Sequence, residues 1–202
     1  HDSALEQFAN WKSAGVLARA ADYYLATPST AGTVSKGQYY ELKGSQQEQQ
    51  SFTVPATDFA GALDMNFVNM SNTKFIVITV TGDNPNIDVR SVAVDSTPPA
   101  TILDPSYQSL AKRIVWVFPD ATNIKFSGSG QIPGSFIAPN ANVNVTMTGG
   151  GLNGRLWAGG NVEFNVSGGW EIHLFGILSC PKPPVDVTPV APVVTQATCD
   201  AD

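Results

Sequence analysis

Residues 114–132 read IVWVFPDATNIKFSGSGQI, residues 134–152 read GSFIAPNANVNVTMTGGGL, and residues 154–172 read GRLWAGGNVEFNVSGGWEI. Each segment begins with an apolar run, turns at a Pro or Gly corner, continues as an alternating strand and ends in a glycine-rich turn. The segments start about twenty residues apart, a period typical of stacked solenoid coils. Because one coil cannot bury its apolar side alone, we expect the three to stack as successive rungs. Phe136 and Leu156 should then lie in the same layer.

The composition favours an extracellular β protein and argues against several partners. The chain has 202 residues, of which 43% are hydrophobic and only 14% are charged, and it is rich in Gly, Ser, Thr and Asn. Its net charge is −6 and its Lys and Arg are scattered, which argues against nucleic acid or an anionic membrane as a partner. No apolar run approaches the roughly eighteen residues of a membrane span, so we predict no direct membrane insertion.

The rest of the chain predicts one long helix, short strands and a linker. Ala4–Leu25 has an imperfect helical apolar period, and Thr27-Pro28 ends it. A short helical turn is expected over Tyr107–Arg113. From residue 179 onward the sequence is rich in Pro, Val and Thr without periodicity, so we divide the chain into a domain, 1–178, and a linker toward a following domain, 179–202. Strands are predicted at Thr33-Val34, Gln38–Leu42, Ser51–Val54, Phe75–Val80 and Ile87–Val94.

Both cysteines lie in this linker. Cys180 and Cys199 form a candidate disulfide in an oxidising compartment, with free thiols as the alternative. Two Cys without a nearby His cannot complete a tetrahedral metal site, so we predict no metal and no cofactor.

The ordered motifs FPDA (118–121), APNA (138–141) and ExH (171–173) resemble the choice-of-anchor A domain of secreted and wall-attached bacterial surface proteins. Tyr40–Gly44 and the strand Phe75–Gly82 are also similar to that family, and the resemblance covers roughly residues 4–178. It implies a right-handed β-solenoid with a flanking α-helix, similar in outline to the ice-binding β-solenoids. It also implies a cell-surface or cell-wall location. Members usually carry a Gly-rich segment upstream of the helix, so we expect that the first coils were cut away or belong to a separate piece.

Glu171 and His173 share one strand face and could form an acid/base pair. No nucleophile stands in a recognisable catalytic context, so we interpret the pair as a structural contact. Trp116 and Trp157 fall in the apolar runs and are expected inside the coil, whereas Trp170 could equally stack on a sugar ring. Lys125 is a candidate for a Lys–Asn isopeptide bond, which would lower the intact mass by one ammonia.

An alternating strand places several polar residues on one face. A flat Thr row could order water as ice-binding surfaces do, but Glu163 interrupts the row, so we interpret this face as solvated and able to bind a ligand. The predicted ligand-binding residues are Asn142, Asn144, Thr146, Asn161, Glu163 and Asn165, with Trp170 at the rim.

We therefore predict a non-enzymatic adhesin module that binds a host or matrix protein or a glycan. One alternative is a structural spacer that displays other domains. A second is an ice-binding protein. A third is a hydrolase or polysaccharide lyase, but these enzymes need charged residues clustered in a groove, and here acids and bases are dispersed.

Overall fold

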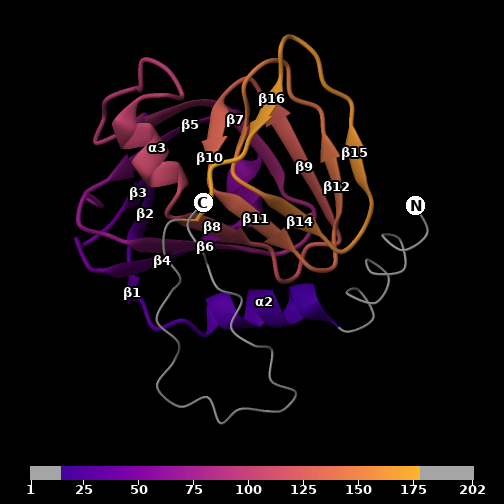
Figure 1. Ribbon diagram of the computed structural model, residues 1–202, viewed down its shortest axis with the longest axis horizontal. Coiled ribbons are helices and arrows are strands. Elements are labelled where there is room, and N and C mark those ends of the chain that lie inside the picture. The colour runs from indigo at the N-terminus through magenta and orange to yellow at the C-terminus, as the bar shows by residue number, and fades with distance from the viewer. Residues whose placement is uncertain (1–14, 178–202) are drawn as a thin grey trace.

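The computed structural model describes residues 15–177 and is mainly β, with three sheets wrapped around one core (Figure 1). Sheet A contains, in spatial order, β1 (Thr30–Ala31), β4 (Gln49–Pro55), β6 (Phe75–Thr81), β8 (Ile114–Val117), β11 (Ser135–Ala138) and β14 (Leu156–Ala158). Sheet B contains β15 (Val162–Phe164), β12 (Asn142–Val145), β9 (Asn123–Gly128), β7 (Asn86–Val94), β5 (Leu63–Val68), β3 (Tyr40–Lys43) and β2 (Thr33–Lys36). Sheet C contains β10 (Gln131–Pro133), β13 (Gly151–Asn153) and β16 (Glu171–His173).

The three similar segments form three successive rungs. Each rung passes once through sheet A, once through sheet B and once through sheet C, and all pairing between rungs is parallel. Phe136 pairs with Trp116 of the rung before and with Leu156 of the rung after. The predicted stacking of twenty-residue segments is therefore confirmed, and the segments are not the hairpins of a sandwich.

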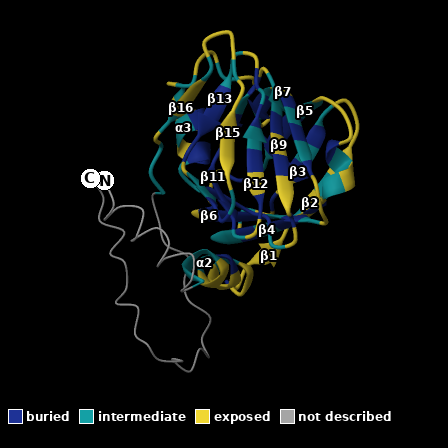
Figure 2. Ribbon diagram, turned by 90° about the vertical axis from the view of Figure 1, so that its right-hand side faces the viewer, coloured by how far each residue is buried: buried dark blue, intermediate teal, exposed yellow. Residues whose placement is uncertain are grey.

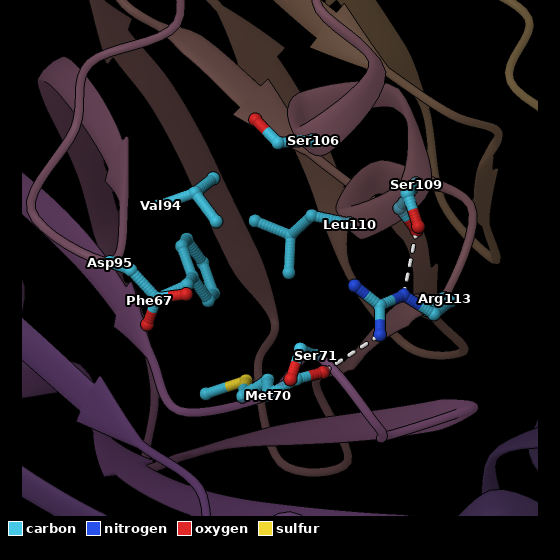
Figure 3. A pocket seen from close by; sticks show the side chains of 9 residues that line it. All are labelled: Phe67, Met70, Ser71, Val94, Asp95, Ser106, Ser109, Leu110 and Arg113. Carbon is cyan, nitrogen blue, oxygen red and sulfur yellow. Dashed lines mark hydrogen bonds between the residues drawn. The ribbon is translucent and has the colours of Figure 1, made fainter.

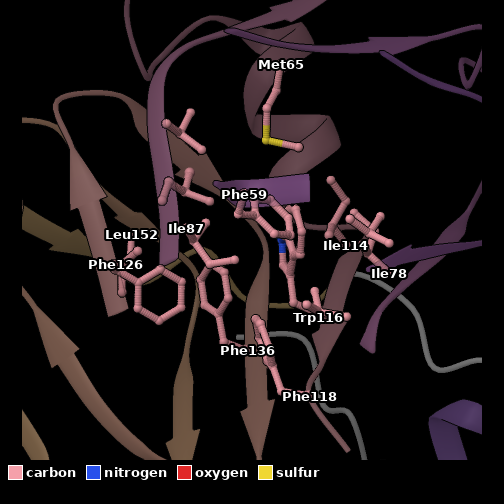
Figure 4. Packing of buried hydrophobic residues seen from close by; sticks show 14 of the residues in the cluster. Phe59, Met65, Ile78, Ile87, Ile114, Trp116, Phe118, Phe126, Phe136 and Leu152 are labelled. Atoms are coloured by element: carbon pink, nitrogen blue, oxygen red, sulfur yellow. The ribbon is translucent and has the colours of Figure 1, made fainter. Parts of the chain in front are cut away.

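The inward side chains of the sheets form one continuous core (Figure 4). Trp116 is fully buried there, stacks on Phe136 at 6.1 Å between ring centroids and donates its indole N–H to the carbonyl of Pro133 at 2.8 Å. Phe126 of sheet B meets Phe136 edge-on at 5.1 Å. Aromatic rings from neighbouring rungs thus fill the interior between the sheets, as expected for Trp116.

The middle of sheet A, strands β6, β8 and β11, is buried on both faces, because helix α2 (Val16–Leu25) lies along its outer side (Figure 1). Ala21 of the helix packs on Phe75, Val77 and other outward residues of the sheet. Burial on two faces explains the uninterrupted apolar run Ile114–Val117. The prediction that Trp157 lies inside the coil is wrong: Leu156 takes the inward position, and strand alternation sends Trp157 outward to the cluster beneath α2.

The predicted long helix is found only in part within the described residues. It runs over Val16–Leu25, and Gly15 before it has a φ of 63°. It ends before Pro28, as predicted. The remainder of the expected helix, from Ala4, lies outside the described residues, as do the Pro-rich linker and both cysteines.

The upstream rungs are less regular than the three similar ones. All five predicted strands are present, and α3 (Pro105–Ala111) occupies the expected helical turn. Three further elements, β1, β5 and the 3-10 helix η1 (Ala56–Phe59), were not predicted. Strand β5 lacks the alternating apolar pattern because a polar residue, Asn66, occupies a buried position. The side-chain amide of Asn66 donates to the hydroxyl of Ser96, and its Oδ1 atom accepts the backbone N–H of Ser96.

The corners between strands form contacts from rung to rung. The side-chain amide of Asn140 donates to the carbonyl of Pro119, in the equivalent corner one rung earlier, at 3.3 Å. This contact links the corners of two successive rungs. Gly134 has a φ of 108°, and a Cβ there would lie 2.6 Å from Ile114. Glycine at this corner therefore permits the close approach of two rungs.

Candidate binding face

The outer side of strands β9, β12 and β15 forms a flat surface of amide, hydroxyl and charged groups. Figure 2 shows these strands side by side in sheet B. We call this surface the polar face; it consists of Asn123, Lys125, Asn142, Asn144, Thr146, Asn161, Glu163 and Asn165. All six polar side chains predicted on this face therefore lie together on it.

Parallel register arranges the polar face in rows that cross the strands. One row is Asn123, Asn142 and Asn161, and the Oδ1 atom of Asn142 accepts the backbone N–H of Asn161 at 2.9 Å. The row continues upstream, since the amide of Asn123 donates to the Oδ1 atom of Asn84 at 3.1 Å. This ladder holds the amide groups at the spacing of the strands.

A second row brings opposite charges to either side of an amide. Asn144 pairs with Lys125 on one neighbouring strand and with Glu163 on the other. The Oδ1 atom of Asn144 is buried and accepts no hydrogen bond within the described structure. A buried acceptor without a partner costs free energy at this position of the row. The row also places Lys125 beside an asparagine, the two residue types of the isopeptide hypothesis, which stays a prediction.

Trp170 does not stand free at the rim of the polar face. Its indole N–H points to the sulfur of Met147 at 3.2 Å, and its ring lies 5.3 Å from that of Phe164. The side chain is half-buried and packs against the core. Only part of its ring is therefore available for stacking on a ligand.

Glu171 and His173 make a side-chain contact on β16. The Oε2 atom of Glu171 lies 2.8 Å from the Nε2 atom of His173, and Phe175 stacks on the imidazole. Glu171 and His173 stand on sheet C, away from the polar face of sheet B. Residues 15–177 contain no cluster of three or more His, Cys, Asp or Glu side chains that could hold a metal ion.

Sequence reasoning missed two members of the polar face, Asn123 and Lys125. The signal was present, because each stands nineteen residues before a predicted residue, Asn142 or Asn144, in the preceding similar segment.

Within the described residues, no helix is both long and apolar enough to span a membrane.

Parallel rungs, a helix along one sheet and a broad polar surface on another define a β-solenoid-like domain. The chain belongs to the family described as "Putative Ice-binding-like adhesive domain", whose model matches residues 5–174. No curated protein and no solved structure matches the chain. The likeness to ice-binding domains is thus confirmed at the level of the family, whereas membership of the choice-of-anchor A domain stays a prediction.

Proposed function

We propose that this domain is a non-enzymatic adhesive module of a bacterial surface protein, and that its polar face binds a glycan or protein ligand. Membership of an adhesive family supports the general function. The observation that carries the proposal is the flat array of Asn142, Asn144 and Asn161 side chains on rigid parallel strands. Amides held on strands can donate and accept hydrogen bonds over a broad, shallow area without ordering a loop.

The charge pattern favours a hydroxyl-rich ligand such as a glycan. Lys125 and Glu163 flank Asn144, so the face is polar without a strong field of one sign. The exposed amides of Asn142 and Asn161 offer donors and acceptors that sugar hydroxyls can use.

Ice binding is the second candidate, because the family description names it. Its support is the flat face and the register of the rows. Glu163 and Lys125 interrupt any repeated Thr row, which favours the glycan over ice. Thermal hysteresis and recrystallisation assays on the intact protein separate the two functions.

We also propose that the stack is a right-handed coil, as crossovers between parallel strands almost always are.

A further coil would cover the downstream end of the stack. Val162, Phe164 and Ile172 belong to the last rung and remain 41%, 47% and 45% exposed, although their counterparts Val143, Val145 and Leu152 are buried. An apolar rung needs a neighbouring coil or a cap. These exposed side chains therefore support the expectation of additional coils, which would cover the last rung.

A glycan array probed with the intact protein tests the binding proposal. The double variant Asn142→Ala/Asn161→Ala should lose most of any signal, because it removes one row of amides. Asn72→Ala is the matched control, since this exposed asparagine lies in the turn between β5 and β6. Binding that survives in the double variant would remove the polar face as the site, and absence of saturable binding to glycans and to cells would favour the structural spacer.

A further inference from the structure

A second site lies away from the polar face, in the irregular half of the molecule. A pocket of about 210 Å³ opens between the ends of β5 and β7, the turn after β5, and helix α3 (Figure 3). Its volume suits a single small molecule rather than a chain of several sugar units.

The floor of the pocket is apolar and its rim is polar. Phe67, Met70 and Leu110 are buried and supply the floor. The rim carries the exposed residues Ser71, Ser106 and Ser109. A ligand there would place an apolar part inward and hydroxyl-bonding groups at the mouth.

Arg113 supplies the positive charge of the pocket. Its Nε atom donates to the carbonyl of Ser109 at 2.8 Å, and its Nη1 atom donates to the carbonyls of Met70 and Thr73. Its remaining nitrogen, Nη2, points toward the interior of the pocket (Figure 3). The guanidinium is thus oriented by three carbonyls while one edge stays directed at the cavity.

No carboxylate neutralises this guanidinium within residues 15–177, because all three of its hydrogen bonds go to backbone carbonyls. Burial lowers the pKa of Arg113, since it disfavours the charged form, yet arginine stays protonated in proteins. A half-buried cation without an anionic partner is stabilised by an anion that enters from solvent.

Asp95 lines the opposite side of the pocket and limits which anion fits (Figure 3). Its Oδ1 atom accepts the backbone N–H of Asn69 at 2.7 Å. A dianion such as phosphate would be attracted by Arg113 but repelled by Asp95, so its net binding free energy would be small. A molecule with a single carboxylate can contact Arg113 and present a hydroxyl or ammonium group to Asp95.

We propose that this pocket binds a small molecule that carries one carboxylate together with a hydroxyl or ammonium group. Two sources share this chemistry, a sugar acid and a free amino acid. The carboxylate contacts the Nη2 atom of Arg113, the donor group contacts Asp95, and the body of the ligand rests on Phe67 and Leu110. The site is independent of the polar face, so its failure leaves the adhesive function untouched.

Titration of the intact protein with sodium glucuronate and with leucine, followed by two-dimensional NMR, tests the proposal. Glucose and leucinamide are the controls, because each lacks the carboxylate. The expected result is saturable binding of glucuronate or leucine, and weaker or no binding of its control. Absence of saturation up to about 10 mM for both acids, or equal binding of acid and control, would overturn the site.

Three variants assign the contacts. Arg113→Lys should weaken binding by about tenfold, because the directed planar edge is lost. Ser109→Leu should abolish binding by filling the mouth, and it keeps Arg113 and its backbone acceptor; a thermal melt matching the wild type shows that the variant is folded. Binding unchanged in Ser109→Leu would place the ligand elsewhere.

Asp95→Asn separates the two sources of ligand. The amide still accepts the N–H of Asn69 but no longer repels a carboxylate. Glucuronate should bind about threefold more tightly, whereas leucine should bind more weakly because its ammonium loses an ionic partner. An unchanged affinity for both would contradict the placement of Asp95 beside the ligand.

Discussion

The downstream rungs, residues 114–173, repeat one length, whereas the upstream rungs, residues 30–113, vary in length. Downstream, Val115 pairs with Ser135 and Phe136 with Leu156, both across twenty residues. Upstream, Gln49 pairs with Phe75, but Ile76 pairs with Ile114. Sheet C explains the difference, because its short strands close each downstream rung on the third side. Upstream, η1, α3 and loops occupy the connections between sheets A and B.

The two halves therefore provide different kinds of surface. Repetition places like residues side by side and yields the flat polar face. Irregular connections bring α3 and Arg113 against the ends of β5 and β7 and leave a concave pocket. A broad ligand suits the first surface, and a small molecule suits the second.

Trp116→Ala should have the largest effect on stability, because this residue joins the first two rungs of the regular half. The side chain is fully buried, and its loss should lower the free energy of unfolding by about 3–5 kcal/mol. Denaturant titration measures the change. Trp157→Ala is the matched control, since Trp157 is half-buried beneath α2 and should cost clearly less. Equal losses would show that the interior of the regular rungs is not the main source of stability.

Gly134→Ala tests whether the close stacking of the regular rungs requires glycine. The new Cβ would lie 2.6 Å from Ile114, at a φ of 108° that other residues rarely adopt, so a loss of about 1–3 kcal/mol is expected. Gly61→Ala is the control in the upstream half, where a Cβ would meet no atom within 4 Å. The melting temperature should fall strongly only in Gly134→Ala. Similar falls in both variants would show that close rung spacing does not require glycine at this corner.

Tyr107→Phe examines how α3 is attached to sheet C. The hydroxyl donates to the carbonyl of Gln131 at 2.9 Å and accepts from the amide of Asn153 at 2.8 Å. Its removal leaves buried polar groups with fewer partners and should cost about 1–2 kcal/mol. Tyr39→Phe serves as the control, because the described structure shows no hydrogen bond for that hydroxyl. Loss of stability in the control alone would contradict the role of this bond.

Regularity also explains how much could be predicted from sequence. Phe136 and Leu156 were placed in one layer because the repeat itself encodes their pairing. Trp157 was misplaced because an apolar run buried on both faces hides its alternation. The pocket was not foreseen, because Phe67, Asp95 and Arg113 are brought together only by tertiary packing of segments with no common period.

Asp83→Asn should have the smallest effect and concerns the junction of the two halves. The carboxylate follows β6 and accepts hydrogen bonds from the backbone and the hydroxyl of Thr122, at 2.7 and 2.8 Å. These bonds hold the pKa of Asp83 below its ordinary value against the opposing effect of desolvation, and bonds from Asn84 add to the lowering. A depressed pKa in the folded state means that the stabilisation is complete above the unfolded pKa, about 3.9, and is lost as the pH falls through the folded value.

Melting temperatures measured from pH 2 to pH 6 check this junction. The wild type should lose stability between pH 4 and pH 2 more steeply than Asp83→Asn, because the amide cannot be protonated in that range. Asp88→Asn on β7 is the control for a general change of one charge. If the melting temperatures of wild type and Asp83→Asn fall equally between pH 4 and pH 2, the carboxylate of Asp83 does not join the irregular rungs to the regular ones.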